Sequence, residues 1–100
     1  MSKESSNIKE KNRAGFREPG QYNVIVLNDD FTPMDIVTLI LKHIFFKDDT
    51  EAEILMLKVH NEGKAIVGTY TFDIAMTKAT GATNLARKNG FPLRILVNKA

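Results

Sequence analysis

The feature that most constrains this fold is an abrupt change of pattern close to residue 28. An apolar, β-branched run from Tyr22 to Leu27 is typical of a strand. Three polar residues, Asn28–Asp30, follow at once, and apolar residues at helical spacing begin at Ile36. The chain is therefore expected to leave a strand and enter a helix within a few residues. Such junctions often carry binding groups, because side chains can converge where the backbone leaves a sheet.

The start of this first helix is predicted from the residues after the polar run. Thr32 is a candidate N-cap, Pro33 suits the first helical position, and Asp35 complements the positive end of the helix dipole. The apolar stripe of the helix has a 3-4-3 spacing. Its members are Ile36, Val37, Ile40, Leu41 and Ile44.

A second helix is predicted after residues 47–50, which break the first stripe and contain capping residues. Gly63 suits the left-handed position that ends such a helix. The stripe of this helix ends in a histidine. It consists of Ala52, Leu55, Met56, Val59 and His60.

The remaining chain predicts a strand, a helix and a strand. Residues 65–70 and 93–97 are the strands, and Thr71 is a candidate cap of the helix between them. The small residues of this helix allow close packing on a sheet. They are Ala75, Ala79, Ala82 and Ala86.

The predicted fold class is α+β, a compact two-layer α/β sandwich with the order β-α-α-β-α-β. We expect a three-stranded sheet with all three helices on one face. Residues 65–70 and 93–97 are expected to pair in parallel through a right-handed crossover. Residues 1–20 are polar and aperiodic, so we expect a disordered, flexible N-terminal extension before a core domain of residues 21–100.

Composition excludes several classes of function. The chain has no cysteine, and serine occurs only before residue 20, so thiolate metal sites and serine or cysteine nucleophiles are not expected in the core. Residues 1–20 hold five basic and three acidic residues, whereas the remainder holds nine of each. This balance argues against nucleic-acid binding. No apolar run approaches a membrane span or a signal-peptide core, so we expect a cytoplasmic protein.

Asn28, Asp29 and His60 are the candidate binding residues. Taken separately, the polar run is a turn and the histidine is a favourable charge at a helix end. The short connection between the first two helices, however, returns the second toward the start of the first. His60 could then approach Asn28 and Asp29. An amide oxygen, a carboxylate and an imidazole would together supply the three acceptors that a primary ammonium needs.

Apolar side chains near these acceptors would bind one bulky side chain, for roughly 1.5–3 kcal/mol. Such a site would recognise a free amine joined to a large apolar group, as in the first residue of a peptide. The wall candidates are Met34, Val37, Met56 and Val59. A metal site is not expected, because no EF-hand or HExxH spacing is present. Asp73 and Lys78 would lie on a solvated face of the third helix.

Two strings resemble the ClpS family of Clp protease adaptors. The first is Asn-Asp-Asp-Phe-Thr-Pro-Met at residues 28–34, and the second is Met-x-x-Val-His-x-x-Gly-Lys-Ala at residues 56–65. The resemblance extends over roughly residues 20–100. It implies an adaptor without enzymatic activity or cofactor. The implied partners are N-degron substrates that begin with Leu, Phe, Tyr or Trp, and the N-terminal domain of a ClpA-like or ClpC-like AAA+ unfoldase.

The resemblance also implies a role for each matching residue. Asn28, Asp29 and His60 match the residues that hold the substrate's α-amino group. Met34 matches the residue that narrows the entrance against β-branched side chains. The implied pocket and the loop beside it comprise Asp30, Thr32, Met34, Val37, Met56, Val59 and Leu93. Asp73 and Lys78 match surface positions that contact the unfoldase, and the N-terminal extension matches the segment that the unfoldase engages.

Two alternatives remain open at this point. A ribosome-associated interaction module has a similar small α/β sandwich, although a shared fold is weak evidence of shared function. A metal-dependent hydrolase would use the same polar residues as ligands.

Overall fold

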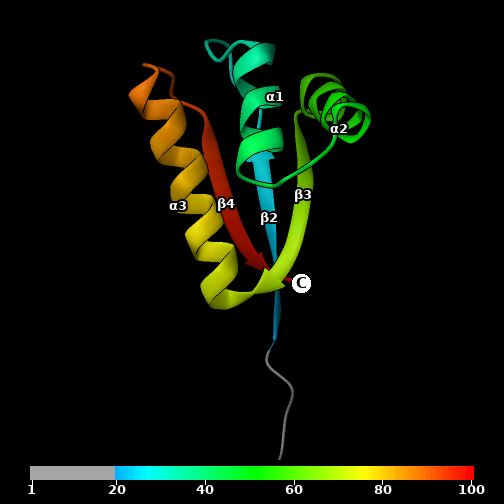
Figure 1. The fold of residues 1–100 in the computed structure, drawn as a ribbon, viewed down its shortest axis with the longest axis vertical. Coiled ribbons are helices and arrows are strands. Elements are labelled where there is room, and N and C mark those ends of the chain that lie inside the picture. The colour runs from blue at the N-terminus through cyan, green and yellow to red at the C-terminus, as the bar shows by residue number, and fades with distance from the viewer. Residues whose placement is uncertain (1–19) are drawn as a thin grey trace, which may run out of the picture.

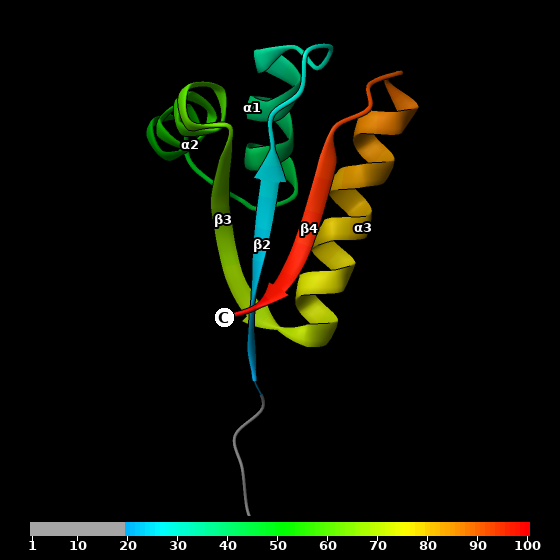
Figure 2. The same cartoon turned by 180° about the vertical axis from the view of Figure 1, so that it is seen from behind.

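The computed structural model describes residues 20–100 and has two layers, a sheet and a set of helices (Figure 1). The elements are β2 (Gln21–Leu27), α1 (Met34–His43), α2 (Asp49–Glu62), β3 (Lys64–Thr71), α3 (Phe72–Lys88) and β4 (Arg94–Lys99). All three helices cover the same face of the sheet, and the other face is bare when seen from behind (Figure 2). The predicted fold class and element order are confirmed. The predicted extension falls on residues 1–19, outside the described part, and on Gly20.

The strand order corrects one expectation. The sheet has the order β3-β2-β4, and β2 pairs antiparallel with both neighbours. The predicted parallel pairing of the last two strands is therefore wrong, because β2 lies between them. β2 contributes the fully buried Val24 and Val26. These side chains are well shielded because β2 has a neighbouring strand on each side. The 17 residues of α3 make a helix about 25 Å long, which is enough to connect strands across an intervening one.

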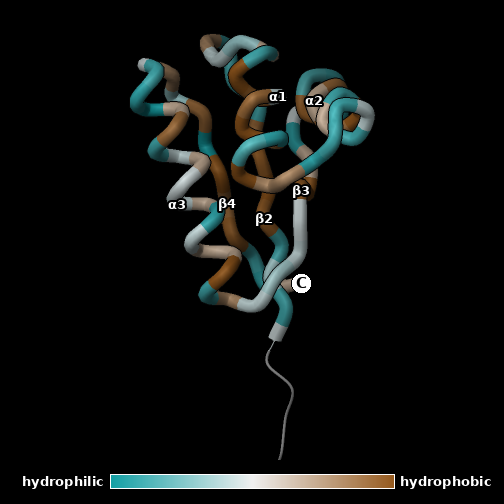
Figure 3. Tube along the Cα trace, in the orientation of Figure 1, coloured by the Kyte–Doolittle hydropathy of each residue, from teal (hydrophilic) through white to brown (hydrophobic). Residues whose placement is uncertain are grey.

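The core lies between the sheet and the helices, where hydrophobic residues concentrate along β2 and α1 (Figure 3). The predicted stripe of α1 faces this core, with Val37, Ile40 and Leu41 buried. The four alanines predicted to allow close packing of α3 are all buried. In α2, Ala52 and Val59 are buried, whereas His60 at the end of the stripe is exposed.

Helix termini confirm some predicted caps and correct others. Asp48 caps α2 by accepting the Glu51 N–H at 2.8 Å, and Gly63 is left-handed with φ 89°, as predicted. Helix α1 starts at Met34 with Pro33 as N-cap, one residue later than predicted, because the Thr32 side chain is bound elsewhere. Thr71 is the N-cap of α3, but its side chain makes no capping hydrogen bond.

Candidate functional site

The loop between β2 and α1 is organised by the carboxylate of Asp29. Its Oδ1 accepts the backbone N–H groups of Phe31 and Thr32, each at 2.8 Å. Its Oδ2 accepts the Thr32 hydroxyl at 2.7 Å, and Thr32 is only 6% exposed. These bonds satisfy backbone donors that precede the helix, which explains why Thr32 is not free to act as a cap. The loop is therefore held in one conformation by a single side chain.

The same contacts keep Asp29 ionised. Partial burial raises the pKa of its carboxyl, but hydrogen bonds from Thr32 and Phe31, with the positive charge of Arg87, lower this pKa below its ordinary value of 3.8. A carboxylate offers about four acceptor directions, of which three are used here. Asp29 thus retains a negative charge and one acceptor direction for a cationic ligand.

The loop is joined to the end of α2 by backbone contacts. The N–H of Asn28 donates to the carbonyl of Gly63 at 2.8 Å, and Leu27 pairs with Lys64 in the sheet. His60 lies in the last turn of α2, immediately before Gly63. The side chains of Asn28 and His60 are exposed and make no hydrogen bond within residues 20–100. The structure therefore brings the two predicted halves of the site to the same end of the sheet, where β2 ends and β3 begins.

An open hollow of about 390 Å³ lies between α1 and α2. Two of the predicted wall residues, Met34 and Met56, line it, with Asp35, Thr38, Leu39 and Lys42. The other three predicted wall residues, Val37, Val59 and Leu93, are at most 2% exposed and belong to the core. Lys42 also binds Asp49 at 2.7 Å, which connects the end of α1 to the start of α2. Asp30 is exposed in the neighbouring loop.

Lys78, predicted on a solvated face, is instead half-buried against other residues. Its Nζ donates to the Ile44 carbonyl at 2.9 Å and lies 4.6 Å from the ring centroid of Phe46 and 5.5 Å from that of Tyr70. Asp73 is exposed in the first turn of α3. The two residues predicted to contact an unfoldase are thus on one helix, and Lys78 is positioned by aromatic rings.

Phe46 is a surface residue that the sequence argument did not identify. It is 78% exposed and, among residues 20–100, the only non-glycine residue with positive φ, at 55°. Its ring lies under the Lys78 ammonium, a favourable cation–π geometry. The available signal was that Phe46 follows the apolar stripe of α1 without fitting its spacing. A phenylalanine that follows a helix and lies outside its apolar stripe is a candidate for a contact residue on the surface.

A rigid acceptor loop beside an open apolar hollow, on a two-layer sandwich, defines a small ligand-binding domain. Comparison with known proteins is more specific: the family model described as ATP-dependent Clp protease adaptor protein ClpS matches residues 17–96. The chain belongs to this family. Within residues 20–100, no helix has the length and apolar character needed to cross a membrane.

Individual relatives agree with this assignment. The ATP-dependent Clp protease adapter protein ClpS of Treponema denticola is 54% identical over 84 residues, which cover 84% of this chain and 83% of that protein. The ClpS of Burkholderia cenocepacia is 41% identical over 98 residues, covering 98% and 94%. A solved structure, Agrobacterium tumefaciens ClpS2 bound to L-phenylalaninamide, has a TM-score of 0.80 and 38% identity, covering 83% of this chain and all of that one. The resemblance is confirmed, and the ribosome-associated alternative is not favoured.

Proposed function

We propose that this chain binds polypeptides through an N-terminal Leu, Phe, Tyr or Trp and delivers them to a Clp AAA+ unfoldase. The observation that carries the proposal is the Asp29 loop, tied to the end of α2 by the Asn28–Gly63 bond, beside a hollow lined by Met34 and Met56. Acceptors for an amine and apolar contacts for a side chain then lie next to each other. The chain itself does no covalent chemistry in this proposal.

Asn28, Asp29 and His60 are assigned to the substrate's α-amino group. The free acceptor direction of Asp29 takes one ammonium proton, while the Asn28 amide oxygen and a neutral imidazole nitrogen take the others. L-phenylalaninamide, the ligand of the Agrobacterium relative, has a free α-amine, an uncharged amide and a phenyl ring, which are the groups of a peptide's first residue. This chemistry supports the proposed assignment.

The substrate side chain is assigned to the apolar groups behind the loop. Met34 would limit the entrance, because a long side chain close to the substrate's Cβ leaves room for one substituent on that carbon, as in Leu or Phe, and not for the two of Val or Ile. Asp30 and Thr32 border this site, and Met56 with Val37, Val59 and Leu93 completes it. These three core residues would be reached only if Met34 or Met56 changes rotamer on binding.

Asp73 and Lys78 are assigned to contact with the N-terminal domain of a ClpA-like or ClpC-like unfoldase. Asp73 is exposed, and Lys78 is held by Ile44 and Phe46, so a partner would meet a positioned charge rather than a mobile one. A cytoplasmic location follows from this partner.

A peptide series that varies only the first residue tests the amine-reading site. A peptide that begins with Phe is expected to bind in fluorescence anisotropy, and its N-acetylated form is expected to show no saturable binding, because acetylation removes the ammonium. A peptide that begins with Val is expected to bind at least about tenfold more weakly. Equal affinity of the free and acetylated Phe peptides would contradict the proposal.

The two histidines of the chain provide a matched pair of variants. His60→Ala is expected to weaken binding of the Phe peptide about tenfold or more, which corresponds to about 1.4 kcal/mol. Thermal unfolding is expected to change little, because His60 is exposed and has no hydrogen bond within residues 20–100. His43→Ala, also exposed but at the far end of α1, is expected to bind normally. Loss of affinity in both variants would reject the role of His60.

A further inference from the structure

The outer edge of β4 has no part in the proposed function. β4 is an edge strand, since the sheet order is β3-β2-β4. The N–H of Ala100 donates to the Gln21 carbonyl at 2.9 Å, in line with the β2–β4 register. Hydrogen-bonded pairs alternate along antiparallel strands. Counting back from Ala100, Asn98 and Leu96 therefore direct their backbone groups toward β2.

The intervening residues of β4 direct their backbone groups the other way. Ile95, Val97 and Lys99 turn N–H and C=O away from the sheet, and no backbone group within residues 20–100 pairs with them on that side. These groups form a regular row of donors and acceptors. Such a row is the backbone template that strand addition uses.

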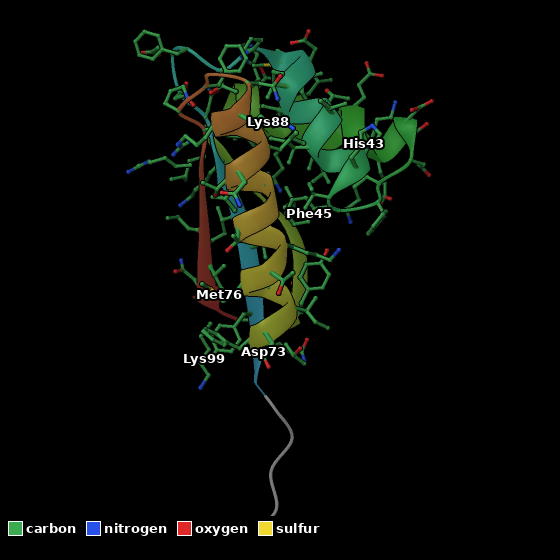
Figure 4. The ribbon with its side chains drawn as sticks, turned by 60° about the vertical axis from the view of Figure 1, so that its left-hand side comes forward. His43, Phe45, Asp73, Met76, Lys88 and Lys99 are labelled. Carbon is green, nitrogen blue, oxygen red and sulfur yellow. The ribbon has the colours of Figure 1, made fainter. Side chains whose placement is uncertain are left out.

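A groove of about 390 Å³ runs between this edge and α3. Met76, Thr80 and Thr83 line its helical side, and their spacing places them on one face of α3. Figure 4 shows Met76 on the side of α3 that faces β4.

The strand side of the groove is lined by Ile95 and Val97. These residues pair with the buried Val26 and Val24, so their side chains face the helices, yet they are only half-buried. A strand that pairs with β4 would point every second side chain toward the helices. Those side chains would enter the groove, which has Ile95 and Val97 on one side and α3 on the other. Apolar side chains would then cover surface that β4 leaves partly exposed.

The charges around the groove select the occupant. No residue that lines it is acidic. Arg94, Arg87 and Lys88 are all exposed at one end, and Arg87 Nη1 is held there by the carbonyls of Phe91 and Leu93, at 3.0 and 2.7 Å. Lys99 lies at the other end, near Asp73 in the first turn of α3 (Figure 4). The end near Arg94 is thus the more basic one and attracts acidic residues.

A second copy of this chain brings no acidic group to this edge, because β4 contains none. Parallel pairing of two β4 strands places Arg94 beside Arg94. Antiparallel pairing through the outward groups of Ile95, Val97 and Lys99 centres on Val97 and places Lys99 opposite Ile95. The basic side chains gain no opposite charge in either arrangement, whereas a partner with acidic residues supplies one.

We propose that the edge of β4 binds an extended segment of another protein as a fourth strand. The segment has alternating apolar residues and an acidic end that lies beside Arg94. The six residues of β4 span about 20 Å, so about six residues of the partner pair with it. This interaction leaves the amine-reading site open, although Arg87 at the basic end of the groove also acts on Asp29 through its charge.

The test uses a dye-labelled, N-acetylated peptide of about ten residues, with three alternating valines and an Asp-Glu-Asp end, and the full chain. Acetylation prevents binding through an α-amine. We expect the peptide with the Asp-Glu-Asp end to bind at least about tenfold more tightly than the same peptide with a Lys-Arg-Lys end. In NMR hydrogen exchange, the amides of Ile95, Val97 and Lys99 are expected to become protected. Equal binding of the two peptides would overturn the proposal.

Variants on the two sides of α3 locate the site. Met76→Glu places a carboxylate in the groove and is expected to weaken the acidic peptide about tenfold or more. Ile74→Glu changes a residue of similar exposure, 49% against 41%, about 200° away around the helix, and is expected to bind normally. Both variants should bind a free Phe peptide with unchanged affinity. Equal effects of the two substitutions would overturn the assignment to the groove.

Other occupants give distinct results. If residues 1–19 occupied the edge, the three amides would be protected without peptide and would lose protection on removal of that segment. If a second copy occupied it, protection would rise with protein concentration, together with a change in sedimentation. Either result would overturn the proposal, whether or not the free Phe peptide binds.

Discussion

Asp29 has two functions at once, and this affects how its variants must be interpreted. Its oxygens accept three hydrogen bonds that shape the loop, and the same group is proposed to hold the substrate's ammonium. Replacement by Ala removes both functions, so a loss of peptide binding would not separate them. Thr32 offers a cleaner test, because replacing its hydroxyl removes one of the three hydrogen bonds and leaves the carboxylate itself in place.

Thr32→Val keeps the shape of the side chain and removes the bond to Asp29. We expect the pKa of Asp29 to rise toward its ordinary value and the free energy of unfolding at neutral pH to fall by about 1–2 kcal/mol. The folded pKa of Asp29 is lowered, so its contribution is present above the unfolded pKa and lost as pH falls through the folded one. The difference between variant and parent should therefore shrink in acid.

Thr38→Val is the control for this experiment. Its hydroxyl donates to the Met34 carbonyl at 3.1 Å, within α1, so this hydrogen bond involves no carboxylate. Its effect on unfolding, measured by denaturant titration at several pH values, should not depend on pH. A pH-independent difference for Thr32→Val as well would contradict the role assigned to Asp29 in the loop.

Phe46→Gly should stabilise the protein, although it removes a large side chain. A left-handed conformation costs a non-glycine residue about 1–2 kcal/mol, and most of the Phe46 side chain is already in solvent. After the entropy of glycine in the unfolded chain and the loss of the cation–π contact with Lys78, a net gain of up to about 0.5 kcal/mol is expected. Phe31→Gly is the control, because Phe31 is equally exposed but has no positive φ. Destabilisation of both variants in thermal melts would contradict the strain at Phe46.

At the scale of elements, two glycines have opposite requirements. Gly63 ends α2 with φ 89° and supplies the carbonyl that binds Asn28. Gly81 lies inside α3, where an added Cβ would make only ordinary contact with Ile44, at 3.6 Å. The first position needs glycine for its backbone, and the second does not.

Gly63→Ala is accordingly expected to lower the free energy of unfolding by about 1–2 kcal/mol and to weaken binding of the Phe peptide by displacing Asn28. Gly81→Ala is expected to raise stability by about 0.5–1 kcal/mol, since alanine favours a helix interior, with no effect on binding. Chemical denaturation and anisotropy on both variants would test this. A stable Gly63→Ala variant would show that the α2 terminus tolerates another backbone conformation.

The elements were more predictable than their arrangement. Apolar spacing correctly predicted α1, α2 and α3. A small domain with a single core buries one face of each helix, and this burial leaves a helical repeat of apolar residues in the sequence. The strand order was not predictable in this way, since β2 is compatible with an edge or a central position until α3 is seen to connect β3 and β4 across it. Thr32 failed as a cap because Asp29 competes for it. The positions of the Lys78 and Phe46 side chains depend on a contact between distant segments, and local sequence patterns carry no information about such contacts.

At the scale of the whole molecule, residues 20–100 contain the three-stranded sheet β3-β2-β4 and the three helices α1, α2 and α3 that cover it. A chain of residues 20–100 should therefore melt within roughly 2 °C of the full chain and bind the Phe peptide with the same affinity. We expect degradation of a Phe-initiated substrate by a Clp unfoldase and protease to be strongly reduced, because the family resemblance implies that the unfoldase engages the N-terminal extension during delivery. Undiminished degradation would reject that role, whereas a large loss of stability would show that residues 1–19 contribute to the core.

The central position of β2 has a consequence for how the protein is made. β2 is complete once residue 27 has been synthesised, yet one of its neighbours, β4, pairs Tyr22 with Lys99. The sheet therefore cannot close until residue 99 has left the ribosome, and until then β2 has one unpaired edge. Contacts of such long sequence separation form late and slowly, so during synthesis the nascent chain exposes the apolar strand that later supports the binding loop. A chaperone that shields β2 would be most useful in that interval.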